Sequence, residues 1–423
     1  MTSRASSKSQ HGWWLPTVLI FSLFADGTAI SIAGRTPTVL LFDLLLPLVV
    51  AYMLAQNLLG TRHWNFRDKA VLTLGSCYFF AQLLSLLFNL QDIARSVLLI
   101  KVTFFGFLIY WVVIARNRSA TDLEWTTSSL IAWGGVVGFI LLYRFVTDWS
   151  TVIGPTASYD VKDLGISMGR SNYLAALLVP IFPLALAVAT AAAGWRKLMP
   201  IIAAFAMAIG LLITFSKGAA LGLLGAAVIS VPVLLKNGVA IRHILFSIVI
   251  ATAFLWMMPR NLVLSNYEMI VYRLHTPDLE RPDLWRVAWH EFVQHPIVGI
   301  GPNCIYIYNR QFAIDVLHTH NFVLNWLAEL GVLGSVPFFA IMGVFIRRAY
   351  RLCFTPNTVP GASRVAIGLY VGLLATLLHG LVEPTFQGPQ YSAVFWFLAA
   401  LIFLYEPGHG ISNLRPVSAG AQV

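Results

Sequence analysis

Apolar segments long enough to cross a membrane alternate with short polar segments along most of the chain. A helix needs about 20 mostly apolar residues to span the hydrocarbon core of a bilayer. The stretch 199–235 is too long for one such helix, and we divide it at Ser216–Gly218, where a charge and a glycine interrupt it. The pattern then predicts spans at approximately 14–33, 37–59, 70–89, 96–115, 127–147, 172–193, 199–216, 218–235, 241–258, 321–346, 365–383 and 390–406. We therefore expect an all-α integral membrane protein with about twelve transmembrane helices.

The overall composition supports this class. The 423 residues are 58% hydrophobic and only 11% charged, whereas soluble domains carry about 25% charged residues. Such a chain has too few polar side chains to cover a water-soluble body of this size. Lipid must therefore be the solvent for much of its surface.

The distribution of basic residues predicts the orientation. Cytoplasmic loops of membrane proteins are enriched in Lys and Arg. With twelve spans and a cytoplasmic N-terminus, more than half of the 28 basic residues fall in inner segments, for example in 347–351. Both termini are then cytoplasmic. The net charge of +10 reflects this bias, so we expect no nucleic-acid partner.

Two polar segments on the outer side are longer than the other connections. They run from about 144 to 171 and from about 259 to 320. The chain thus divides into spans one to nine (1–258), an outer loop with short helices (259–320), and the last three spans with a cytoplasmic tail (321–423). Within the loop, a helix is expected to begin near Pro282 and to end before Pro296, with a turn over 299–302.

The candidate chemistry lies in this loop and at the start of the span that follows it. The order is Arg-Pro-Asp-Leu-Trp from Arg281, then His-Pro-Ile-Val-Gly-Ile-Gly from His295, then His-Thr-His-Asn from His318. The next span continues with Glu329-Leu-Gly-Val-Leu-Gly. Two earlier elements are Gly-Arg-Ser-Asn-Tyr-Leu-Ala from Gly169 and Ser-Lys-Gly from Ser216.

This set of motifs, over about 170–335, resembles the signature of the O-antigen ligase and polymerase superfamily. In that family an Arg begins a short helix containing Trp, a Pro-x-x-Gly-x-Gly turn follows, and His-Asn opens a helix reading x-x-Glu-x-Gly-x-x-Gly. Here Lys217 stands where the family frequently has Arg. The resemblance implies a membrane glycosyltransferase of the C type, in the inner membrane of a bacterium, with its active site on the periplasmic face. It implies an O-antigen ligase that moves an undecaprenyl-pyrophosphate-linked O-antigen to lipid A-core during lipopolysaccharide assembly, with membrane lipids around it.

The residue types suit that chemistry. Guanidinium and ammonium groups bind phosphate and stabilise the charge that grows on a diphosphate leaving group. The predicted topology places four cations on the outer side, which we expect to bind the donor: Arg170, Lys217, Arg281 and Arg286. A histidine can accept the proton of an attacking sugar hydroxyl. We expect His320 and Arg281 to be catalytic, and His318 and Asn321 to contact substrate. The sequence contains no Asp-x-Asp cluster, so we expect a metal-independent transfer without cofactor.

Each candidate also has a structural interpretation. Arg281 could be a helix-start charge paired with Asp278 or Asp283. Arg286 lies five residues further on, off that helix face, where a pair with Asp283 or His290 is the alternative. His320 could cap its span, and Glu329 could be a packing residue although acids inside membranes are often functional.

Three other functions compete with the ligase. An O-antigen polymerase or a protein O-oligosaccharyltransferase would use the same donor with another acceptor. A lipid-linked glycan permease or flippase belongs to another class, but such transporters often place polar groups near the midplane of the membrane, whereas here they gather in one outer loop. A non-catalytic scaffold would retain function after loss of Arg281 and His320.

Overall fold

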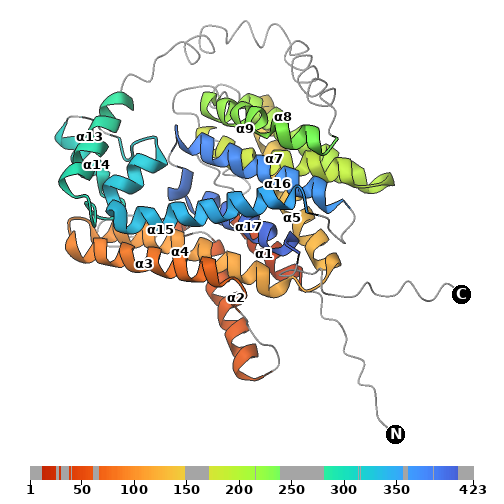
Figure 1. Cartoon of the computed structure of the whole chain (residues 1–423), viewed down its shortest axis with the longest axis horizontal. Coiled ribbons are helices and arrows are strands. Elements are labelled where there is room, and N and C mark those ends of the chain that lie inside the picture. The colour runs from red at the N-terminus through yellow and green to blue at the C-terminus, as the bar shows by residue number, and fades with distance from the viewer. Residues whose placement is uncertain are drawn as a thin grey trace, which may run out of the picture.

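Long apolar helices form the body of the protein (Figure 1). The computed structural model describes residues 12–24, 28–29, 38–39, 41–60, 66–147, 171–214, 216–238, 281–312, 314, 316–355, 361–383 and 385–407. The N-terminal half contains α1 (Trp14–Phe21), η1 (Ser22–Phe24), β1 (Thr28–Ala29), β2 (Thr38–Val39), α2 (Leu41–Leu58), α3 (Lys69–Phe88), α4 (Ile93–Arg116), α5 (Ala120–Thr147) and α7 (Ser171–Ala191). It is followed by η3 (Gly194–Lys197), α8 (Leu198–Ile213), α9 (Lys217–Lys236), α13 (Arg281–Gln294), α14 (Ile305–Gln311), α15 (Phe322–Leu352), α16 (Ala362–Gly380), η4 (Thr385–Gln387) and α17 (Pro389–Tyr405).

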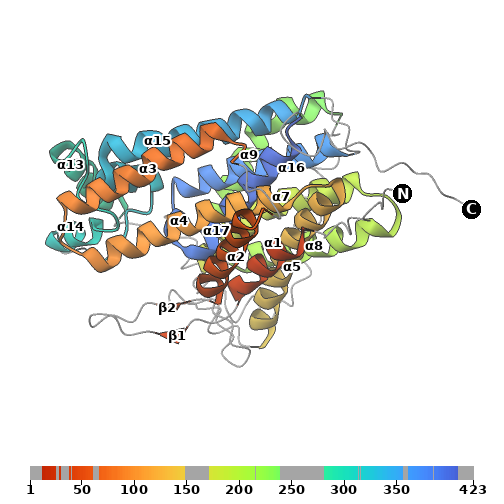
Figure 2. The same cartoon turned by 90° about the horizontal axis from the view of Figure 1, so that it is seen from below.

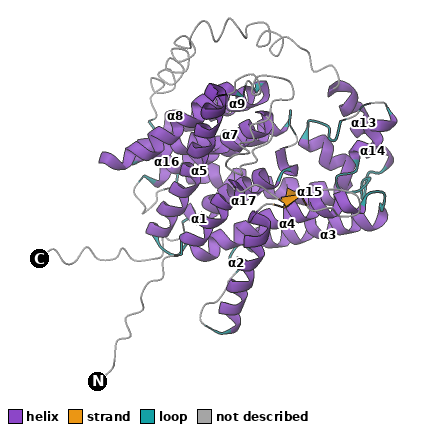
Figure 3. Ribbon diagram, turned by 180° about the vertical axis from the view of Figure 1, so that it is seen from behind, coloured by secondary structure: helices purple, strands orange, loops and turns teal. Residues whose placement is uncertain are grey.

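Nine helices of the described ranges are long and apolar enough to cross a membrane, and two apolar helices, Trp14–Phe24 and Pro389–Tyr405, are shorter. Each predicted span within those ranges contains a helix, whereas the span predicted at 241–258 lies outside them. Figure 3 shows how completely helices dominate the described structure. The class of an all-α membrane protein is therefore confirmed, and the count of twelve stays a prediction.

The predicted first span is wrong in its extent. Its described helix ends at Phe24, and Thr28–Ala29 pairs with Thr38–Val39 in a two-residue antiparallel ladder. Gly27 and Pro37 flank these strands in the sequence and are poor helix formers. A continuous helix over 14–33 is therefore replaced by a short helix and a hairpin-like pairing.

The division of the apolar stretch 199–235 is confirmed. Helix α8 ends at Ile213 and α9 begins at Lys217. The Ser216 hydroxyl caps α9 by accepting a hydrogen bond from the Ala219 amide, at 3.3 Å. A serine at this position satisfies one of the amides that a helix start leaves without a partner. The break therefore places the beginning of α9 at one end of the bundle.

The helix predicted near Pro282 is also confirmed, as α13. Its buried face, formed by Leu284, Val287, Ala288 and Glu291, belongs to the side that packs on α15. Figures 1 and 2 agree that α13 and α14 lie together at one end of the long helices α3, α4 and α15. Arg281 stands at the first residue of α13.

A break in α15 accommodates the turn that follows α13. Gly331 has φ 58° and ψ −163°, which interrupts the helical hydrogen-bond ladder. The turn supplies the missing partners: the Ile300 and Gly301 amides donate to the carbonyls of Ala328 and Glu329, at 3.0 and 3.1 Å. In return the Val332 and Leu333 amides donate to Pro296 and Ile297, at 2.9 and 3.1 Å. The turn and the broken helix therefore hold each other in place.

Small residues let α16 approach its neighbours closely. A methyl group on Gly372 would stand 2.3 Å from the Pro180 carbonyl oxygen of α7, and one on Gly222 would stand 2.9 Å from the Ala375 carbonyl oxygen. Glycine allows helix backbones to approach in this way within membranes. Helix α16 is thus clamped between α7 and α9, and this packing fixes where its C-terminal end lies.

Candidate functional site

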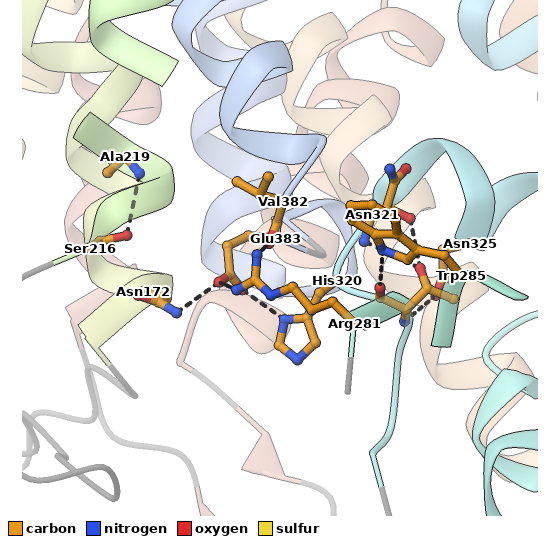
Figure 4. Close-up of polar contacts among 11 residues, drawn as sticks. Asn172, Ser216, Ala219, Arg281, Trp285, His320, Asn321, Asn325, Val382 and Glu383 are labelled. Atoms are coloured by element: carbon orange, nitrogen blue, oxygen red, sulfur yellow. Dashed lines mark hydrogen bonds and ion pairs between the residues drawn. The ribbon is translucent and has the colours of Figure 1, made fainter. Parts of the chain in front are cut away.

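The carboxylate of Glu383 is the centre of a polar cluster at one end of the bundle (Figure 4). Its Oε1 lies 3.1 Å from Arg281 Nη2 and accepts a hydrogen bond from Asn172 Nδ2, at 2.7 Å. Its Oε2 lies 3.1 Å from His320 Nδ1. Two residues that the sequence analysis singled out, Arg281 and His320, therefore meet on one buried carboxylate.

The directions of the helices explain this meeting. Asn172 stands in the first turn of α7, Arg281 at the start of α13, and His320 just before α15. Glu383 follows the end of α16. Helices α7 and α15 begin where α16 ends, so the side chains at these termini gather at one end of the bundle although up to 211 residues separate them in the chain.

His320 owes its position to an unusual backbone. It has φ 52°, which only a few per cent of residues other than glycine adopt. The next residue, Asn321, caps α15: its Oδ1 accepts hydrogen bonds from the amides of Val323 and Leu324, at 2.9 and 3.1 Å. Strained backbone of this kind is often associated with functional sites. Here the strain and the cap together direct the imidazole toward Glu383.

The contact with Glu383 determines which ring nitrogen of His320 is basic. An ionised carboxylate can only accept hydrogen bonds, so Nδ1 must carry the proton that is shared with it. In the neutral ring, Nε2 then holds the lone pair. The side chain is 25% exposed. This arrangement leaves Nε2 able to accept a proton from a bound molecule.

The charges around Glu383 favour its ionised form. Burial by itself raises the pKa of this carboxyl group, because a charge loses solvation. The hydrogen bond from His320 and the charge of Arg281 oppose burial, and the net pKa lies below its ordinary value of 4.5. Glu383 is therefore a carboxylate at neutral pH.

Arg281 is oriented by backbone as well as by charge. Its Nη1 donates to the Val382 carbonyl oxygen, at 2.9 Å. One helical turn further on, Trp285 Nε1 donates to the Thr319 carbonyl oxygen, at 3.0 Å. These two bonds connect α13 to the end of α16 and to the residue before His320. They therefore fix the position of the Arg281 guanidinium relative to the His320 imidazole.

Lys217 and His318 lie beside this cluster, whereas the side chain of Asn321 caps α15. Lys217 is exposed at the start of α9. A methyl group on its neighbour Gly218 would stand 2.7 Å from Val382 Cγ2, so α9 begins against the residue that binds Arg281. The His318 ring contacts the His320 ring edge-on, with centroids 4.4 Å apart.

Arg286 and Arg170 are not placed in the cluster. The Arg286 side chain is 78% exposed and pairs with Asp283 at 2.5 Å, which favours the structural alternative. Arg170 lies outside the described residues.

Glu329 forms hydrogen bonds to other elements of the bundle, as its structural interpretation predicted. Its Oε1 accepts a hydrogen bond from the Ile305 amide at the start of α14, at 3.3 Å. Its own carbonyl oxygen accepts from Ser85 Oγ, at 2.9 Å. No group of three or more His, Cys, Asp or Glu side chains in the described ranges is arranged to hold a metal ion.

Glu383 and the role of Asn172 were missed by sequence reasoning. Glu383 is the last residue of the predicted span 365–383. An acid in an apolar span is by default a candidate functional residue. Asn172 was visible only as part of a motif. Neither position reveals its partner in the sequence, because the contacts depend on how α7, α13 and α16 pack.

The helices and this site together define an integral membrane protein with guanidinium, imidazole and carboxylate groups at one end of its bundle. Residues 202–339 match the family model described as O-antigen ligase. That segment is similar to the O-antigen ligase family, and it contains Lys217, Arg281 and His320. No curated protein matches the chain.

Proposed function

We propose that this protein is an O-antigen ligase of a bacterial inner membrane. In this proposal it transfers a glycan from undecaprenyl pyrophosphate to a sugar hydroxyl of lipid A-core, at the periplasmic face. The observation that carries the proposal is the convergence of Arg281 and His320 on Glu383. The family match supports the donor class and the type of chemistry.

The cations of the site are suited to the diphosphate of the donor. Arg281 presents a planar guanidinium that can bind two phosphate oxygens at once. Lys217 supplies a second charge from the exposed first turn of α9. The positive end of that helix adds to the attraction for an anion. We assign both residues to the diphosphate, with Arg170 as a further candidate.

His320 is assigned to the acceptor. Its Nε2 would receive the hydroxyl proton while the acceptor oxygen bonds to the anomeric carbon of the donor glycan. The bond from that carbon to the diphosphate oxygen breaks, and the electron pair leaves with the diphosphate. Arg281 and Lys217 stabilise the charge that develops there. His318, in contact with His320, would line the acceptor side.

The test is a transfer assay with purified protein in lipid nanodiscs, undecaprenyl-linked glycan and lipid A-core. Arg281→Ala and His320→Ala should each lower the rate by about a hundredfold or more. Arg286→Ala, which removes an exposed and already paired cation, is the matched control and should stay near the wild-type rate. Full activity of both site variants would remove the assignment.

A cellular experiment separates the ligase from the polymerase, which uses the same donor. Without the protein, long glycan that is not attached to lipid A-core indicates loss of ligation. Single repeats attached to lipid A-core indicate loss of polymerisation, and would replace the proposed acceptor.

A further inference from the structure

We propose that Glu383 couples donor binding to proton removal. In the structure its carboxylate is shared between Arg281 and His320. When the donor diphosphate occupies Arg281, the carboxylate is left to His320 and strengthens it as a base. This inference rests on the proposed function and deepens it, because it makes Glu383 a positioning residue that acts through two others.

The geometry shows the sharing directly. The two oxygens of Glu383 serve different partners, with Oε1 3.1 Å from Arg281 Nη2 and Oε2 3.1 Å from His320 Nδ1. The Glu383 side chain is only 9% exposed, while those of Arg281 and His320 are 19% and 25% exposed. The acid is thus the buried member, and the two groups that would touch substrate are more accessible.

The negative charge of the donor diphosphate explains why Arg281 would exchange Glu383 for the donor. A diphosphate brings more negative charge to Arg281 than one carboxylate does, and Arg binds phosphate in a favourable bidentate geometry. Two anions on one guanidinium repel each other, so the donor weakens the pair between Arg281 and Glu383. The buried carboxylate then needs its remaining hydrogen-bond donors, Asn172 and His320. Its charge becomes available to stabilise a protonated imidazole.

The consequence is an ordered reaction. Before the donor binds, Arg281 neutralises much of the charge of Glu383, and His320 is the weaker proton acceptor. Once the donor is present, His320 Nε2 takes the proton of the acceptor hydroxyl more readily. The proton therefore moves when an electrophilic carbon is available.

The groups that face Glu383 come from several elements. Arg281 comes from α13, His320 from the segment before α15, His379 from α16, and the neutral Asn172 from α7. Lys217 begins α9 beside Val382, and η4 contributes no charged side chain. The proposed exchange takes place between Arg281 and His320, which both contact the carboxylate directly.

Glu383→Gln tests the inference because it keeps the size of the side chain and removes the charge. We expect kcat to fall by about a hundredfold. The acidic limb of the kcat profile should move to lower pH, since a neutral amide no longer stabilises the imidazolium. Binding of the undecaprenyl-linked donor should be unchanged or tighter, because Arg281 has lost a competing anion. Glu124→Gln, at an exposed pair with Arg196, is the control and should leave all three measurements unchanged.

Two further variants test the coupling if Glu383→Gln does not fold. Glu383→Asp keeps the charge and should retain the position of the acidic limb with a smaller loss of kcat. Asn172→Ala removes one hydrogen bond to the carboxylate and should lower kcat by about tenfold.

A merely structural Glu383 would give a different result. If donor binding and kcat fall together and the pH profile keeps its position, the coupling is overturned. If Glu383→Gln has wild-type kcat while Arg281→Ala and His320→Ala are inactive, the coupling also fails and the proposed function stands. Full activity of both Arg281→Ala and His320→Ala would instead remove the proposed function itself.

Discussion

Gly299 and Gly331 lie against each other where the turn after α13 enters the break in α15. A methyl group on Gly331 would stand 2.8 Å from the Gly299 amide nitrogen and 2.3 Å from the Ile297 carbonyl oxygen. Both residues also have positive φ, 70° and 58°. Only glycine combines this conformation with such a close approach of two backbones. The contact holds α13, and with it Arg281, against the helix that follows His320.

Gly331→Ala should therefore destabilise the protein by about 3 kcal/mol, because the new methyl group meets backbone that cannot move away cheaply. Thermal unfolding in detergent measures the effect. Gly343→Ala is the matched control in the same helix, since nothing lies within 4 Å of a methyl group there. The control should be neutral or stabilising by about 0.5–1 kcal/mol. Equal effects of the two substitutions would contradict the close backbone contact between Gly299 and Gly331.

Gly218→Ala should reduce transfer more than it reduces stability. The added methyl group would meet Val382 Cγ2 at 2.7 Å and His379 Cδ2 at 3.0 Å, so α9 must shift from the end of α16. Lys217 would then move relative to Arg281, with an expected loss of about tenfold in kcat/KM. Gly225→Ala, which meets only Leu378 Cδ1 at 3.0 Å, is the control on the same helix. A normal rate for Gly218→Ala would argue against a role of this helix start.

Arg281→Lys keeps the positive charge and removes the planar guanidinium group, which can bind two phosphate oxygens at once. It should raise KM for the donor by about tenfold, which corresponds to about 1.4 kcal/mol. Steady-state kinetics at varied donor concentration measure it. Arg286→Lys, in an exposed pair with Asp283, should leave KM unchanged. A change at Arg286 equal to that at Arg281 would restore Arg286 to the donor site.

The stability of the protein should depend on pH through Glu383. A carboxyl group whose pKa is lowered on folding stabilises the protein fully above its ordinary pKa, here 4.5. That stabilisation is lost as the pH falls through the lowered value. The melting temperature of the wild type should therefore fall more steeply below pH 4.5 than that of Glu383→Gln. Parallel curves would show that Glu383 is not held ionised by its partners.

The sequence predicted most of the elements correctly because their signals are local. Runs of apolar residues gave the helices, and Ser216 with Lys217 marked the end of one span and the start of the next. The signals were weaker near 25–40, where a short ladder replaces the predicted helix. Local patterns describe what a segment can form, and they leave its neighbours undetermined.

The candidate site was predicted in part for the same reason. Motifs pointed to Arg281 and His320, and the structure brings the two together. Arg286 was also expected to bind the donor, with a pair to Asp283 or His290 as the alternative. The turn of α13 directs its side chain to solvent and to Asp283.

By itself, then, the sequence determined that this is a helical membrane protein with cations and histidines near one loop, because hydropathy and residue type act within each segment. Only the tertiary structure decided that Glu383 holds Arg281 and His320, and which nitrogen of His320 remains basic. These contacts join residues 102 and 63 positions apart. They exist because close packing of α16 against its neighbours brings the helix ends within hydrogen-bond distance.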